Sequence, residues 1–178
     1  MEKSLKYGKY TIEINFGFDE VDDNPRNWAQ GILYGLDKPM EEFEENKEEI
    51  KRDFFIFPVY KYEHGLVAFH IGNTTSATKD FDTGFYGLLA VPKINKWNDE
   101  WDYDTAESLA LSELEEWECY CNGTIYEYHI FDEDLMIDEY HSGYFSEDVC
   151  IEEAIKDAKY YTERDEKDAV NFWAKNSD

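Results

Sequence analysis

Residues 53–71 read Asp53-Phe-Phe-Ile-Phe-Pro-Val-Tyr-Lys-Tyr62-Glu-His-Gly65-Leu-Val-Ala-Phe-His-Ile71. Aromatic and β-branched residues dominate 53–62 and 66–71, which is typical of strands. The turn at His64-Gly65 joins the two strands, so the stretch predicts a β-hairpin. Pro58 has no backbone N–H to donate, which indicates an edge strand or a bulge at that point.

Further strands and helices are predicted on both sides of this hairpin. Alternating apolar and polar residues predict a strand at 10–16, and apolar runs predict strands at 84–91, 124–131 and 135–140. One helix is expected at 40–52, and a second is expected to be capped by Asp104 or Thr105 and to run to about Cys121. A third helix is expected to begin after the N-cap Ser146 and to extend, with a break, to Trp173. Residues 19–28 are expected to form an acidic loop pinned by Trp28.

Hairpin-linked strands interspersed with helices predict an α+β fold, with a mainly antiparallel sheet and helices packed on one face. The whole chain, 1–178, is expected to be a single acidic domain in which 160–178 form a helical tail. In the helix after Asp104 the expected buried stripe is Leu109, Leu111, Leu114, Trp117 and Cys121. The glutamates between them, Glu113 and Glu116 included, are expected to face solvent.

Negative charge is concentrated in one block of the chain. Trp97–Ile155 comprises 59 residues without a lysine or arginine, and contains 19 of the 42 acidic residues. Because 42% of all residues are apolar and 17% aromatic, this is a folded, charged surface rather than a disordered tail. The net charge of -25 argues against nucleic acid and anionic membranes as partners, and favours basic proteins.

The chain is expected to be a soluble cytoplasmic protein. It has no apolar run of the length that spans a membrane, and its N-terminus lacks the apolar region of a secretory signal. The cysteines, Cys119, Cys121 and Cys150, are odd in number, which does not favour a disulfide framework.

Catalytic and metal-binding patterns are present only in fragments. Asp82-Thr83-Gly84 has the letters of an aspartic-protease turn, which would require a second copy to pair the aspartates. Cys119 and Cys121 form one close pair where structural zinc sites use matched sets. The acidic runs 99–104 and 132–134 lack the turn glycine and closing glutamate of an EF-hand. The sequence therefore predicts no enzyme activity, no cofactor and no metal.

The carboxylates are instead expected to act together as a charge pattern. Neighbouring carboxylates on one face of a strand or helix lie about 6 to 7 Å apart, close enough to imitate a row of phosphates. Trp101, Tyr128 and Tyr140 would add stacking on a partner's arginines. A solvated acidic face without a partner is the plainer alternative. The predicted partner-binding residues are Asp99, Trp101, Asp102, Asp104, Glu113, Glu116, Tyr128, Asp132, Glu133, Asp134, Asp138, Glu139 and Tyr140.

Several short motifs occur in a fixed order: Asp23-Asn-Pro-Arg-Asn-Trp28, Phe57-Pro-Val-Tyr-Lys-Tyr-Glu-His64, Asp82-Thr83-Gly84, Gly123-Thr-Ile-Tyr126 and Gly143-Tyr-Phe145. Through these motifs, which are spread over roughly two thirds of the chain, the sequence resembles a diffuse family of small acidic proteins of bacteriophages and mobile elements. The chain departs from that pattern in a longer acidic helix after Pro39 and an extended tail after Tyr161.

The resemblance implies an anti-defence protein, either an anti-CRISPR inhibitor of a Cas9-type nuclease or an antirestriction protein. The expected function is therefore inhibition of a host nuclease by an acidic surface that occupies its DNA- or RNA-binding channel. One alternative is a non-catalytic binding module that sequesters a small ligand, peptide or metal. The other is a carboxylate-metal hydrolase.

Overall fold

The structure, a computed structural model, describes residues 3–17, 23–72, 83–95, 97, 99–132 and 139–175; for Glu139 and 169–175 it describes the backbone only. The chain divides into two compact units. Unit 1 comprises Met1–Asp23 and Gly123–Asp178, and unit 2 comprises Asn24–Asn122. The sequence favoured one continuous domain, whereas each unit has its own sheet and its own core, so each is described by itself.

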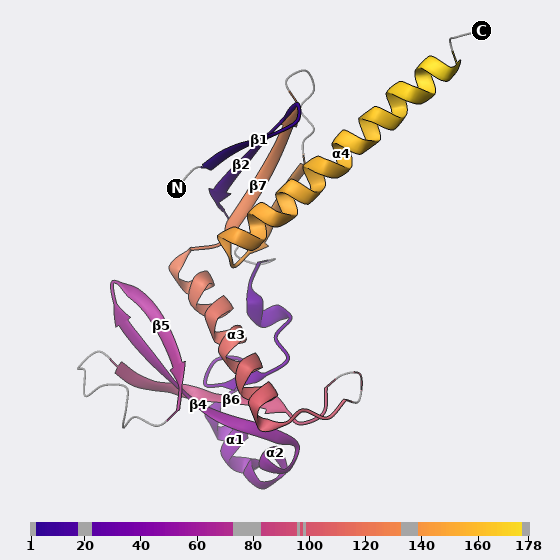
Figure 1. Cartoon of the computed structure of the whole chain (residues 1–178). Helices are drawn as coiled ribbons and strands as arrows, with labels where there is room; N and C mark the ends of the chain where they lie inside the picture. Colours follow the sequence, from indigo (N-terminus) through magenta and orange to yellow (C-terminus); the bar gives the residue numbers. More distant parts are fainter. Residues whose placement is uncertain are drawn as a thin grey trace. The chain divides into compact units, whose positions relative to one another are not determined.

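The predicted α+β class with antiparallel strands is confirmed in both units (Figure 1). Unit 1 contains β1 (Lys3–Tyr7), β2 (Tyr10–Phe16), β7 (Tyr126–Asp132) and β8 (Glu139–Tyr144), in the order β1-β2-β7-β8. Its helix, α4, runs without a break over Glu147–Lys175 and continues past the end of the sheet (Figure 1).

One face of the unit 1 sheet packs against α4. Alternate residues of the central strands are buried there with small residues of the helix, which let the two backbones approach closely. The intervening residues of the same strands lie on the opposite face. The buried set is Tyr10, Ile12, Ile14, Tyr128 and Ile130 from the strands, and Cys150, Ala154, Ala158 and Tyr161 from α4.

Unit 2 contains β3 (Ile32–Tyr34), β4 (Phe54–His64), β5 (Leu66–Ile71) and β6 (Thr83–Pro92), in the order β3-β6-β4-β5. Helix α3 (Tyr103–Asn122) covers one face, and the short helices α1 (Met40–Glu45) and α2 (Lys47–Asp53) cover part of the other. Helices therefore pack on one face in unit 1 and on both faces in unit 2. The α3-side core is Leu33, Phe57, Val59, Leu89, Val91, Ala106, Ala110 and Leu114, and the opposite core is Tyr34, Phe43, Ile50 and Ala90.

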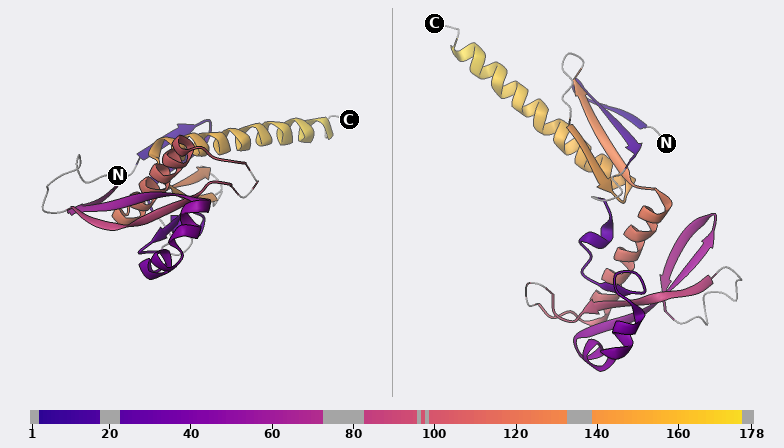
Figure 2. Two further views of the ribbon diagram at one scale, coloured as in Figure 1. Left: turned by 90° about the horizontal axis from the view of Figure 1, so that it is seen from below. Right: turned by 180° about the vertical axis from the view of Figure 1, so that it is seen from behind.

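The predicted hairpin forms between β4 and β5 (Figure 2). Pro58 lies on an interior strand, next to the point where pairing between β4 and β5 stops at Val59. The register of β4 against β6 shifts between Val59 and Tyr60. The expectation of an edge strand is wrong, and the pairing irregularity lies just after Pro58, with its extra residue, Tyr86, on the partner strand β6.

Other boundaries differ from the sequence-based expectations. Strands β1 and β3 were not predicted, and the expected helix 40–52 is divided at Asn46 into α1 and α2. Helix α3 begins after Asp102, whose Oδ1 accepts the N–H of Thr105 at 2.8 Å, so the cap is neither Asp104 nor Thr105. It ends before Gly123, as predicted, and the φ of +64° at that residue suits glycine.

Two expectations fall wholly or partly outside the described residues. In the expected loop 19–28, residues 19–22 are not described, and Pro25–Asn27 form the 3-10 helix η1. Trp28 is 49% exposed, so burial of its ring does not pin the loop. Of the expected strand 135–140, only the last two residues are described, and they begin β8.

Candidate partner-binding surfaces

Four predicted residues lie around the start of α3 in unit 2. Asp99 and Asn95 close a short loop, in which Asn95 Nδ2 donates to Asp99 Oδ2 at 3.2 Å and Asn95 Oδ1 accepts the N–H of Asp99 at 2.9 Å. Asp102 caps α3, and its hydrogen bonds with Thr105 lower its pKa. Asp99, Asp102 and Asp104 are all exposed, whereas Trp101 is partly buried against the α3-side core.

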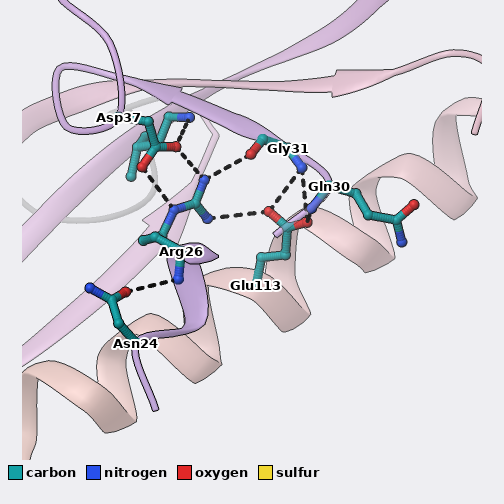
Figure 3. Close-up of polar contacts among 7 residues, drawn as sticks. Asn24, Arg26, Gln30, Gly31, Asp37 and Glu113 are labelled. Carbon is teal, nitrogen blue, oxygen red and sulfur yellow. Dashed lines mark hydrogen bonds and ion pairs between the residues drawn. The ribbon is translucent and has the colours of Figure 1, made fainter. Parts of the chain in front are cut away.

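Glu113 does not lie on the surface. The residue is 7% exposed, because α3 turns Ala106, Ala110, Glu113 and Leu114 toward the core and leaves Leu111 outside. Its Oε1 accepts the N–H groups of Gln30 at 2.7 Å and Gly31 at 3.0 Å (Figure 3). The prediction that Glu113 contacts a partner is therefore wrong, since its carboxylate is already satisfied inside unit 2.

Arg26 is the cation of this buried network. Its Nη1 lies 3.3 Å from Glu113 Oε2, and its Nε and Nη2 donate to the two oxygens of Asp37 at 3.2 and 2.6 Å (Figure 3). Burial acts to lower the pKa of Arg26, but the two carboxylates outweigh it and raise the pKa. Arg26 also donates to Gly31 O at 2.8 Å, so the network fastens the loop 24–37 to α3. This arrangement is structural.

Glu116 lies one turn further along α3 and is half-buried. Burial raises the pKa of its carboxyl, and a hydrogen bond with Trp28 opposes that shift. Of the three predicted residues within α3, Asp104 is exposed and Glu116 is half-buried, and only Glu113 is withdrawn from the surface of unit 2.

Tyr128 in unit 1 is 1% exposed. Its hydroxyl donates to Asp157 on α4, and its ring contacts those of His141 and Tyr144. Burial, followed by the hydrogen bond with Asp157, raises the pKa of the phenol strongly. The prediction that Tyr128 stacks on a partner's arginine is wrong, because its ring faces the core between the sheet and α4.

Among the remaining predicted residues, Asp132 ends β7 and Tyr140 lies near the start of β8. Asp132 forms an ion pair with Lys9, whose Nζ lies 2.7 Å from Oδ2, and the carboxylate is largely buried. Tyr140 is 48% exposed, as a partner-binding residue requires. Three others, Glu133, Asp134 and Asp138, lie outside the described residues, and only the backbone of Glu139 is described.

Tyr140 belongs to a group that we call the open sheet face: Glu13, Glu127, His129 and Tyr140, on the side of the unit 1 sheet opposite α4. The pairing places Glu13 opposite His129 and His129 opposite Tyr140 on adjacent strands. The hydroxyl of Tyr140 donates to Glu127 Oε2 at 2.9 Å, and His129 Nε2 lies 3.6 Å from Glu127 Oε1. Burial raises the pKa of Tyr140.

Glycine at position 17 lets Glu127 occupy this position, because a Cβ there would collide with the Glu127 carboxylate. Glu13, Glu127 and His129 were not among the predicted residues. The sequence feature that indicates them is the alternation of buried and exposed residues along β2 and β7, in which Glu127 and His129 flank the buried Tyr128. Charge counting alone does not separate the two faces of a strand.

Acidic residues are displayed by both units rather than by one. The formal charge of unit 1 is -14 and that of unit 2 is -11. The boundary between the units divides the cation-free block, because residues 97–122 belong to unit 2 and residues 123–155 belong to unit 1. The exposed carboxylates on helices also include residues outside that block. They are Glu41, Glu44, Glu45, Glu48, Glu49 and Asp53 on α1 and α2, and Glu163, Glu166 and Asp168 on α4.

Unit 2 also has a hollow of about 530 Å³ where the end of β6 meets the start of β4. Phe54, Pro92, Ile94 and Trp101 supply apolar walls, and Arg52, Asp53, Lys93 and Glu100 supply two charges of each sign. Arg52 is held by Asp53 through two hydrogen bonds, and Lys93 Nζ donates to the carbonyls of Lys51 and Arg52. The cations of the hollow are therefore engaged by the protein itself.

Within the described part of the chain, no three His, Cys, Asp or Glu side chains are grouped to hold a metal ion. The described helices include none with the length and apolar character to cross a membrane. The chain matches no family model, no curated protein and no solved structure.

Proposed function

We propose that this protein is a phage- or mobile-element-encoded inhibitor that binds a host nuclease in the bacterial cytoplasm through carboxylates on a folded surface. The observation that carries the proposal is the open sheet face. Glu127 is fixed there between Gly17, Tyr140 and His129. A carboxylate held in advance loses little conformational entropy on binding a partner's arginine or lysine.

The partner's surface must be basic. A charge of -14 on unit 1 and -11 on unit 2 repels nucleic acid and accelerates encounter with positively charged surfaces. A guide-loaded Cas9-type effector holds its heteroduplex in a positively charged channel and is the favoured target. A restriction enzyme is the next candidate. Occupying such a channel excludes the substrate, so inhibition needs no catalysis, cofactor or metal.

The test uses the full chain with a guide-loaded Cas9-type nuclease and, in parallel, a restriction enzyme. Binding is measured at about 50 and about 500 mM salt, concentrations between which the screening length shortens severalfold. We expect stoichiometric inhibition of DNA cleavage, and an affinity that falls at least tenfold at the higher salt. An affinity unaffected by salt would contradict the electrostatic mechanism.

A pair of matched variants locates the binding surface. Glu13→Gln/Glu127→Gln and Glu41→Gln/Glu45→Gln remove the same number of charges, but only the first pair lies on the open sheet face. We expect the first variant to weaken binding about tenfold and the second by less than twofold. Equal losses would mean that net charge alone, and not this face, drives association.

The hollow in unit 2 favours a second candidate, a non-catalytic binding module. Its volume of about 530 Å³ falls in the range of small-molecule sites, and its walls are mainly apolar with a few polar groups. A ligand that fits it would raise the unfolding temperature, and above its Kd the shift would grow with the logarithm of its concentration. Ile94→Ala, which shortens an exposed apolar side chain of the wall, would reduce that shift without weakening nuclease binding.

A further inference from the structure

Three aromatic side chains form a row across adjacent strands of unit 2. Tyr60 on β4 pairs directly with His70 on β5 and with Phe85 on β6. The His70 and Tyr60 rings are stacked, with centroids 5.5 Å apart and planes 19° from parallel. The Phe85 ring stands edge-on to Tyr60 at 5.9 Å. The row His70–Tyr60–Phe85 is named the aromatic row below.

The aromatic row lies on the side of the sheet away from α3. The chain neighbours Phe69 and Tyr86 pack against the α3-side core, so His70 and Phe85 face the other way. None of the three rings belongs to the core cluster under α1 and α2. Phe85 is 55% exposed. Aromatic rings on this part of the face thus remain accessible at the surface.

The register shift between β4 and β6, whose extra residue is Tyr86 on β6, brings the rings into line. The register shift between Val59 and Tyr60 makes Tyr60 pair with Phe85 rather than with Tyr86. Bulges commonly re-aim a side chain in this way. The Nε2 of His70 is buried without a hydrogen-bond partner among the described residues. His70 stacks on the Tyr60 ring, and Phe85, which is 55% exposed, is the ring of the row that a ligand would meet first.

A row of aromatic rings offers its faces to planar groups. Nucleobases and guanidinium groups both stack on such rings. The charge of -11 on unit 2 opposes a polyanionic ligand and attracts a cation. An arginine side chain is both planar and cationic, whereas lysine is not planar and is more strongly hydrated.

We propose that the aromatic row is a stacking platform for arginine side chains of a basic partner. The inference rests on the proposed function for the nature of that partner. It assigns a role to uncharged residues that lie outside the open sheet face, in the other unit of the chain.

The test titrates the full chain with an Arg-Gly repeat peptide, a Lys-Gly peptide of equal length and charge, and oligo(dT), by calorimetry at fixed salt. Both peptides carry the same net charge, so the difference in their affinities reports the guanidinium group itself, and the Phe85 variants below separate its stacking from its contacts with carboxylates. We expect the arginine peptide to bind at least fivefold more tightly than the lysine peptide, and oligo(dT) not to bind.

Variants at Phe85 separate ring stacking from burial of apolar surface. Phe85→Leu keeps an apolar side chain without a π face and should bring the arginine peptide down to the affinity of the lysine peptide. Phe85→Trp should keep the preference. The control is Leu66→Ala, which alters an exposed apolar residue outside the row and should change neither affinity.

Equal affinities of the two peptides for the wild-type protein would overturn the proposal, and so would an undiminished arginine preference in Phe85→Leu. Binding of oligo(dT) that depends on Phe85 would overturn it as well, and would assign the row to bases. A preference for arginine together with no inhibition of either nuclease would leave the platform standing and remove the proposed function. The two failures are thus distinguishable.

Discussion

Arg26 and Glu113 form an ion pair inside unit 2, with Nη1 and Oε2 3.3 Å apart and side chains only 7% and 8% exposed. A carboxylate from the most acidic part of the chain therefore serves the fold. It neutralises a buried arginine and accepts two backbone N–H groups of the loop that precedes β3. Not every acidic residue in a strongly charged chain is available to a partner.

Replacing Glu113 by alanine should destabilise the protein by about 3 to 5 kcal/mol, because Arg26 would remain buried with part of its charge uncompensated. Glu113→Gln should cost less, since its amide oxygen still accepts the N–H groups of Gln30 and Gly31. Urea denaturation followed by circular dichroism measures both. The control is Glu115→Ala, an exposed neighbour, which should change the unfolding free energy by less than about 0.5 kcal/mol. If Glu113→Ala lowered the unfolding free energy by no more than about 0.5 kcal/mol, the structural role of Glu113 would be contradicted.

The error at Glu113 shows what the sequence could not supply. The expected stripe was built from large apolar residues, but α3 buries the small Ala106 and Ala110 and leaves Leu111 49% exposed. This rotation of the helix brings Glu113 inward. Arg26, the residue that makes its burial tolerable, is 87 positions away in the chain, and no local pattern connects the two.

Strand prediction succeeded where alternation was strong. Strand β2 has the predicted bounds, Tyr10–Phe16, because one of its faces is fully buried by α4 and the other is not. Strands β1 and β3 were missed. β1 carries Lys3 and Lys6 at an edge, and β3 is only three residues long, so neither presents a hydrophobic period. The open sheet face was missed for a related reason, since pairing across strands, not spacing along one, brings Glu13, His129 and Tyr140 together.

The outer edge of β5 is covered by side chains of α3. Asn122 accepts the N–H of Val67 at 2.8 Å and donates to its carbonyl at 2.7 Å, and Glu118 accepts the N–H of Phe69 at 3.0 Å. Asn122→Ala should uncover this edge, speed hydrogen exchange of the Val67 amide and promote self-association by strand pairing. Exchange measured by NMR and mass measured by light scattering check both effects. Ser112→Ala, which changes an exposed residue of the same helix, should alter neither exchange nor mass. If the Val67 amide exchanged at the same rate in Asn122→Ala as in the wild type, the proposed protection of this edge by Asn122 would be wrong.

Tyr128 should make stability fall at alkaline pH. Its pKa in the folded state is raised by burial and by Asp157, so above pH 10 the unfolded chain releases this proton while the folded chain retains it. The contribution of Tyr128 to the unfolding free energy is fully present below the ordinary tyrosine pKa and is lost as the pH rises above it. Tyr128→Phe should cost about 1 to 2 kcal/mol at pH 8 through the lost hydrogen bond. The gap between wild type and variant should narrow between pH 9 and pH 11, and a constant gap in urea titrations would contradict this assignment.

Cys150 should report the docking of α4 on the unit 1 sheet. Its thiol is fully buried, and burial raises its pKa to about 11, so little reactive thiolate exists at neutral pH. Cys121 is exposed at the end of α3. With iodoacetamide at pH 8 we expect Cys121 to be alkylated first and Cys150 only when unit 1 opens, as read by mass spectrometry of peptides. Tyr128→Phe, which removes a hydrogen bond between β7 and α4, should accelerate labelling of Cys150 and leave that of Cys121 unchanged. If Cys150 reacted as fast as Cys121 in the native protein, the packing of α4 against Ile12 and Ile130 would be incorrect.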